Sequence, residues 1–240
     1  CLAGYGEMNA GRLAEADSWF ADALRLARQA GDRRLEALAL VGCAWIPLYE
    51  PDPDRAKVVE ALEAAAGFHP FLPPAARAYV FGSLARERAA RGDDLVSGRF
   101  LEHARAAAAL IRYDGPGWGW LSVHGELAGW ESGPRPLYTG VRSLRLGRPA
   151  EALELFVDEL EGTTRPVRRS HLHKFVMDAC VALGDPDRAC ASGMAALDEA
   201  KTHGVRVVNG EVRKARRTFP KPWDSLRPVI ELDERLALAR

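Results

Sequence analysis

The sequence predicts an all-α protein, an α-solenoid of five to six stacked helix hairpins. Three observations predict this fold class. A template of small and larger apolar residues recurs along the chain at helical spacing. No segment shows the period-two alternation with β-branched residues that favours strands. Gly and Pro residues interrupt the helical segments at the expected joints. The 240 residues are 48% hydrophobic, which is enough apolar material for a core.

The repeated template begins with Gly and continues with a small residue at plus five and a larger apolar residue at plus nine. Gly11, Ala16 and Phe20 form the first copy, with Ala23 at plus twelve. The small positions of the five copies are 16, 56, 97, 152 and 189, so their spacings are 40, 41, 55 and 37 residues. The period is therefore about 40 residues, with one insertion of about 15 residues after the third copy.

The template has a direct physical meaning. The small residue and the residues four and seven positions later lie on one face of a helix. A small side chain lets the partner helix approach closely, and Phe or Leu one turn later fills the space beside it. The Gly ends the preceding helix, where a positive φ costs it little. Asp or Pro then starts the next helix. Each copy is thus predicted to be helix, tight turn, helix.

Helices are predicted in the following order: 1–10, 12–30, 33–48, 53–66, 74–91, 95–112, 120–131, 137–146, 149–161, 166–183, 186–203, 207–218 and 224–239. Glycines mark the ends of several of them, namely Gly11, Gly31, Gly92, Gly147 and Gly184. Proline-containing joints separate others, at 51–53, 70–74, 115–117, 133–136 and 220–222. The alanine-rich stretch 104–110 has high helix propensity.

Charge and composition exclude several classes of protein. Lys and Arg number 33 and so do Asp and Glu, which argues against a general nucleic-acid binder and an anionic-membrane coat. No apolar run approaches the roughly 18–20 residues of a membrane span, and the first residues do not form a signal peptide, so a cytoplasmic protein is expected. The chain lacks an initiator Met, which indicates a piece of a longer protein.

Cysteine usage predicts no metal or redox site. The four cysteines, Cys1, Cys43, Cys180 and Cys190, lie far apart with no C-x-x-C pair, and are expected to be reduced, small hydrophobic side chains. His171 and His173 are two residues apart, so on a helix they point in different directions and cannot share an ion. No metal and no cofactor is expected.

The repeat resembles the tetratricopeptide repeat (TPR). In that family a Gly also lies early in the first helix, and Gly4 and Gly140 stand twelve residues before Ala16 and Ala152. Ala44, Ala85 and Met177 occupy this place in other copies, the closing proline is missing, and the period exceeds the 34 residues of the family, so these would be degenerate repeats. The resemblance implies a right-handed solenoid over residues 1–206, with an insertion at 113–136 and terminal capping helices at 207–240.

A narrower resemblance covers most of the chain. The segments LRLGRPAEALELFVDEL (144–160) and 181–219 resemble the carboxy-terminal helical region of actinobacterial helix-turn-helix transcriptional regulators. This implies a sensor, dimerisation or partner-binding module, and a homodimer is one possibility. DNA would be contacted only through an amino-terminal domain preceding Cys1.

In the TPR family the first helices of the repeats line a concave groove. Offsets from the small residue give the groove candidates Trp45, Tyr49, Tyr79, Arg86, Tyr138, Arg145, His171, Lys174 and Asp178, together with Tyr5, Asn9, Ser83 and Val141. Aromatic rings supply contact area and cations bind carboxylates, so a peptide, a small molecule or a protein partner would fit. The alternative is that the aromatic residues are core and the charges form a solvated face.

The insertion adds Trp120 to the candidate binding residues. It also holds Trp118, His124, Glu126 and Trp130, and a long loop of this kind often meets a ligand or partner. The alternative is that its tryptophans fill the gap where regular stacking is interrupted.

The predicted function is non-catalytic binding, and the resemblance implies that the chain is the sensor or partner-binding part of a transcriptional regulator. No G-x-S-x-G, phosphate-loop or G-x-G-x-x-G motif in the right context occurs, so no enzyme is expected. The basic run at 213–217 is interpreted as a solvated helix face. Two alternatives stay open: a constitutive protein–protein scaffold, and a small-molecule enzyme with its site near 113–136.

Overall fold

The computed structural model describes residues 1–50, 53–111 and 136–239. These residues form twelve α-helices and no strand, so the all-α class is confirmed for the described part of the chain. The helices are α1 (Leu2–Asn9), α2 (Leu13–Ala30), α3 (Arg33–Trp45), α4 (Arg55–Gly67), α5 (Pro74–Ala90), α6 (Asp94–Ala108), α8 (Pro136–Arg145), α9 (Pro149–Gly162), α10 (Pro166–Leu183), α11 (Pro186–His203), α12 (Val207–Arg216) and α13 (Arg227–Leu238). Short 3-10 helices lie at η1 (Ile46–Tyr49), η2 (His69–Phe71) and η4 (Lys221–Ser225).

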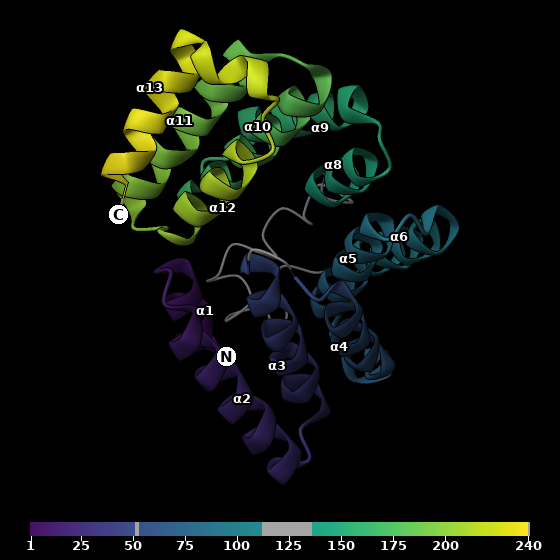
Figure 1. Ribbon diagram of the computed structural model, residues 1–240. Helices are drawn as coiled ribbons and strands as arrows, with labels where there is room; N and C mark the ends of the chain where they lie inside the picture. The colour runs from purple at the N-terminus through teal and green to yellow at the C-terminus, as the bar shows by residue number, and fades with distance from the viewer. Residues whose placement is uncertain (51–52, 112–135, 240) are drawn as a thin grey trace.

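The helices pack in neighbouring pairs along the chain (Figure 1). Each helix from α1 to α5 contacts the next one, and the same holds for each helix from α8 to α11. Helix α5 also packs against α8, and α13 covers α11 with Val229, Leu232 and Leu236. None of the described helices combines the length and the apolar character needed to cross a membrane.

The helix ends follow the predicted signals. Gly31, with φ 67°, ends α2, and Asp32 caps the next helix by accepting hydrogen bonds from the backbone N–H groups of Arg34 and Leu35 at 3.0 and 3.2 Å. Gly184, with φ 77°, ends α10 in the same way. These left-handed conformations are the ones that glycine adopts without strain.

Three predicted bounds differ from the structure by three or more residues, and the other bounds of the described helices by two or fewer. The helix predicted at 33–48 ends at Trp45 and continues as η1, because Pro47 has no N–H to donate and its ring clashes with the preceding turn. The helix predicted at 95–112 ends at Ala108, and the one predicted at 224–239 begins at Arg227, after η4. The helix predicted at 120–131 lies outside the described residues.

Two copies of the template share a close packing of Phe on Gly. Phe20 and Phe156 are fully buried, and each lies over the Gly sixteen residues earlier. A Cβ atom added to Gly4 would lie 2.9 Å from the Phe20 ring, and one added to Gly140 would lie 2.5 Å from the Phe156 ring. The first and fourth copies therefore use the same contact between a helix and its partner.

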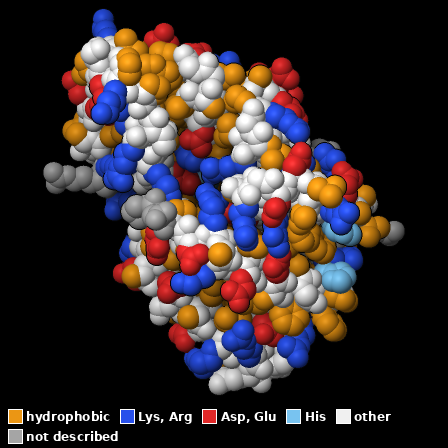
Figure 2. Space-filling model, turned by 45° about the vertical axis from the view of Figure 1, so that its right-hand side comes forward, with side chains coloured by type: hydrophobic (Ala, Val, Ile, Leu, Met, Phe, Trp, Pro, Cys, Tyr) orange, Lys and Arg blue, Asp and Glu red, His pale blue; other side chains and the backbone are white. Residues whose placement is uncertain are grey.

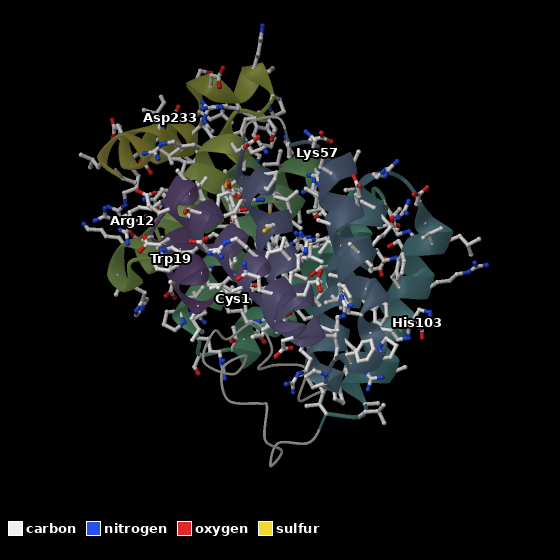
Figure 3. The ribbon with its side chains drawn as sticks, turned by 90° about the horizontal axis from the view of Figure 1, so that it is seen from below. Cys1, Arg12, Trp19, Lys57, His103 and Asp233 are labelled. Atoms are coloured by element: carbon white, nitrogen blue, oxygen red, sulfur yellow. The ribbon has the colours of Figure 1, made fainter. Side chains whose placement is uncertain are left out.

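The buried side chains form two clusters, one from α1 to α6 that also includes Tyr138 of α8, and one from α8 to α13. His103 of α6 and Asp233 of α13 mark opposite sides of the molecule (Figure 3). The two halves meet again at the start of the chain, where α12 contacts α1 and η1. We call this contact the seam. Lys214 Nζ donates to the carbonyl of Glu50 across it, at 2.7 Å. The predicted division into 1–206 and 207–240 stays a prediction.

Candidate functional site

A central cavity of about 790 Å³ lies between the two halves of the molecule. Residues of α1, α2, α3, η1, α4 and α5 line one side of it, and residues of α8, α10 and α12 line the other. Figure 2 shows Lys and Arg side chains gathered around a hollow in the middle of the molecule. The volume is in the range of small-molecule sites.

Nine of the ten binding residues predicted from the sequence line this cavity: Trp45, Tyr49, Tyr79, Arg86, Tyr138, Arg145, His171, Lys174 and Asp178. Tyr5, Asn9 and Val141 also line it. Ser83 is fully buried, and its hydroxyl donates to the Tyr79 carbonyl at 2.8 Å. Trp120 and the rest of the tryptophan-rich insertion up to residue 135 lie outside the described residues, so that prediction has no structural counterpart.

A hydrogen-bonded aromatic wall lines the side of the cavity formed by the first half of the chain. The Trp45 indole N–H donates to the Tyr79 hydroxyl at 2.7 Å, and the Tyr79 and Tyr5 hydroxyls share a hydrogen bond of 3.3 Å. The Arg86 guanidinium lies over the Trp45 ring, 3.8 Å from its centroid. Tyr79 and Tyr138 are each 2% exposed. These rings therefore belong both to the buried core and to the cavity wall.

Two arginines converge on one buried carboxylate beside this wall. Glu87 is 2% exposed, and it accepts a hydrogen bond from Arg55 at 2.5 Å and from Arg86 at 2.9 Å. A buried carboxylate is stable only with such partners. Glu87 therefore fixes both guanidinium groups at the cavity surface.

The opposite side holds two further charged pairs. Lys174 and Asp178, one turn apart on α10, form an ion pair of 2.8 Å. His171 Nδ1 lies 3.0 Å from the carboxylate of Glu211 on α12. Burial acts to raise the pKa of Glu211, but the charge of Lys174 and the hydrogen bond and charge of His171 outweigh it and lower the pKa to about 2. Glu211 is therefore a carboxylate at every physiological pH.

Arg145 and Lys214 also line the cavity. Neither of them has a carboxylate within ion-pair distance among the described residues. The structure gives no hydrogen bond from the Arg145 side chain to any described residue, and Lys214 bonds only the Glu50 carbonyl. Arg145 is an exposed residue of the cavity wall; the loss of surrounding water there and the charges of Arg55 and Arg86 lower its pKa, against the opposing charges of Asp178 and Glu87. Burial and the charges of Arg55, Lys174 and Arg145 lower the pKa of Lys214, against the opposing charge of Glu211. In both cases the effects that lower the pKa outweigh those of the carboxylates.

The cavity wall as a whole is basic. It carries three carboxylates, Glu87, Asp178 and Glu211, and eight Lys or Arg residues: Arg55, Arg86, Arg145, Arg165, Arg168, Lys174, Arg206 and Lys214. Arg168 forms an ion pair with Glu159. This excess of positive charge beside an aromatic wall suits a ligand with a negatively charged group and an apolar part.

The binding residues predicted from the sequence did not include Arg55, Glu87, Glu211 or Lys214. Lys214 belongs to the basic run 213–217, which was expected to be solvated. That interpretation is wrong for several of its members. Lys214 lines the cavity, Arg213 donates to the Leu236 carbonyl at 2.9 Å, and Arg216 pairs with Asp224 and Asp233. Their partners lie on other elements, so spacing within the run gave no signal.

Comparison with models of known protein families gives no match for this chain. Comparison with curated protein sequences gives no matching relative either. The chemistry of the cavity therefore carries the functional argument.

Proposed function

We propose that this chain is a non-catalytic binding domain whose ligand occupies the central cavity. One observation carries the proposal: side chains from nine elements spread along the sequence converge on a single cavity with an aromatic wall and a surplus of cations. Aromatic contact area and a few convergent charged groups are the usual composition of a binding site.

The proposed architecture is a right-handed solenoid of degenerate TPR-like hairpins. The neighbouring pairs of helices, the repeated template and the shared packing of Phe20 on Gly4 and of Phe156 on Gly140 support it. In such an array the inner helices present the binding surface, and here the predicted inner residues are those that line the cavity.

The proposed biological role is that of the sensor domain of a transcriptional regulator. A ligand in the cavity would touch both halves of the molecule, because α3 and α5 lie on one side and α8, α10 and α12 on the other. Such a ligand favours the arrangement in which the seam is closed. An attached effector domain or a dimer interface could then respond to the change.

The cavity chemistry favours binding over catalysis. No serine or cysteine is among the described residues that line the cavity, so the His171–Glu211 pair has no nucleophile of these types to activate there. The carboxylates are held in ion pairs with Arg, Lys or His partners.

A cavity-filling substitution tests the proposal. Gly210 of α12 lines the cavity, and a Cβ added there would meet no atom within 4 Å, so Gly210→Phe places a ring in the cavity without a clash at its base. The probe is 8-anilinonaphthalene-1-sulfonate, an aromatic anion whose fluorescence rises in an apolar site. We expect wild-type protein to bind one probe molecule, and Gly210→Phe to abolish the fluorescence gain.

The matched control is Gly6→Phe. Gly6 also lies within a helix, α1, and also has open space around its Cβ position, but it does not line the cavity. This variant should bind the probe as wild type does. Equal binding by Gly210→Phe, with circular dichroism showing native helix content, would contradict the proposed site.

A further inference from the structure

The charges of the cavity identify the kind of ligand, on the premise that the proposed function holds. Five cations and three carboxylates form what we call the central charge cluster, whose members interact with one another: Arg55, Arg86, Arg145, Lys174, Lys214, Glu87, Asp178 and Glu211. Counted without His171, the cluster has a surplus of two positive charges. The further arginines on the cavity wall, outside this cluster, add to the positive potential.

Two cations of the cluster have no carboxylate partner among the described residues. Glu87 already binds Arg55 and Arg86, Asp178 binds Lys174, and Glu211 binds His171. Arg145 and Lys214 are left without a carboxylate within 4 Å among the residues that the structure describes. Like charges held together in a partly enclosed site repel each other unless an anion lies between them.

The two groups come from different helices and point into the same cavity. Arg145 ends α8, and Lys214 lies on α12, and the positive charge of Arg145 is among those that lower the pKa of Lys214. An Arg guanidinium offers a planar fork to two oxygens of an anion, whereas a Lys ammonium acts as a compact point charge. A tetrahedral group with three acceptor oxygens can serve both at once.

We propose that the cavity binds a compact organic phosphate monoester, with the phosphate between Arg145 and Lys214 and the organic part against the cavity-lining rings of Trp45, Tyr49 and Tyr138. A phosphate monoester carries about −1.5 to −2 charges at pH 7, which matches the surplus of the central charge cluster. A cavity of about 790 Å³ accommodates a molecule of this size. The carboxylates on the wall are no obstacle, because each of them already contacts an Arg, Lys or His side chain.

Calorimetric titration with phenyl phosphate at pH 7.5 tests the assignment. We expect one binding site per chain, and a dissociation constant that rises about tenfold or more in Arg145→Gln and in Lys214→Gln, since each loses a charge-assisted hydrogen bond. The charge-matched controls are Arg227→Gln and Lys57→Gln, whose side chains are 90% and 78% exposed. They should change the dissociation constant by less than about twofold.

Competing ligands separate the possible outcomes. Phthalate carries two carboxylates on a similar ring, and phenyl phosphate binding more tightly than phthalate supports the assignment. Tighter binding of phthalate overturns it, and so does unchanged affinity for phenyl phosphate in both cavity variants. If Arg145→Gln does not fold, Lys214→Gln decides the question alone.

Failure of this inference is distinguishable from failure of the proposed function. Probe fluorescence that depends on Gly210, combined with no phenyl phosphate binding at millimolar concentration, overturns the phosphate assignment and leaves the cavity as the binding site. If probe fluorescence does not depend on Gly210 and phenyl phosphate does not bind, both proposals are overturned.

Discussion

At the scale of single residues, charge pairing fixes the geometry of the cavity wall. Glu87 and Glu211 hold neighbouring charged side chains in place through hydrogen bonds. The first binds two arginines of the aromatic side, and the second joins α12 to α10 through His171. A buried carboxylate that lost these partners would be strongly destabilising. The wall is therefore preorganised before any ligand binds.

Replacement of Glu211 should show this in the pH dependence of stability. The folded state lowers the pKa of Glu211 from 4.5 to about 2, so its contribution is fully present above about pH 4.5 and is lost as the pH falls towards 2. We expect Glu211→Gln to reduce the free energy of unfolding by about 3 kcal/mol at pH 7. Urea unfolding at several pH values from 7 down to 3 measures this, and the difference from wild type should narrow below pH 4.5.

Glu154→Gln is the matched control, because Glu154 is exposed and forms no ion pair with any residue that the structure describes. Its effect should stay within about 0.5 kcal/mol across the same range. A constant difference between wild type and Glu211→Gln from pH 7 to pH 3 would show that Glu211 is not held as a carboxylate by its neighbours.

The sequence located the first-helix side of the cavity but not the residues that complete it. Offsets from the repeated small residue placed Arg145 and Lys174 on the inner surface, because helical periodicity alone decides which face they share. Arg55 and Lys214 lie on helices that the offsets did not assign to the groove. Whether such a residue reaches the cavity depends on long-range packing, which no local spacing encodes.

At the scale of helices, the sequence was most informative where a start or stop signal is chemical. Gly31, Asp32 and Gly184 set helix ends that agree with prediction, because positive φ and side-chain capping are properties of those residues. The α3 helix was predicted too long, since helical periodicity continued through Pro47 and outweighed its missing N–H. Periodicity predicts which face is buried better than it predicts the last turn.

The close packing of helix pairs gives a prediction at this scale. Gly140→Ala would place a Cβ 2.5 Å from the Phe156 ring, so crowding should exceed the gain in helix propensity and reduce stability by about 1–2 kcal/mol. Gly6→Ala, in open space on α1, should instead increase stability by about 0.5–1 kcal/mol. Urea unfolding compares the two. A stabilising Gly140→Ala would mean that α8 and α9 are not packed closely at this contact.

At the scale of the whole molecule, the return of α12 to α1 and η1 turns a row of helix pairs into a cavity with two sides. This contact depends on small rotations that accumulate over the intervening pairs, so one residue pattern cannot predict it. The two buried clusters are joined where α5 packs on α8 and at the seam. Leu13 and Tyr49 pack against both clusters, so they connect the halves directly.

Tyr49→Ala should therefore weaken both halves at once. Loss of a partly buried ring is expected to reduce the free energy of unfolding by about 1–3 kcal/mol. Hydrogen exchange followed by mass spectrometry should show faster exchange in α3 and also in α12, although these helices are more than 160 residues apart in the chain. Phe71→Ala is the control, since Phe71 is 59% exposed and belongs to neither cluster, and it should leave exchange in α12 unchanged. Faster exchange limited to α3 and η1 in Tyr49→Ala would show that the seam does not couple the halves, and a ligand in the cavity would then have no route for acting on the molecule as a unit.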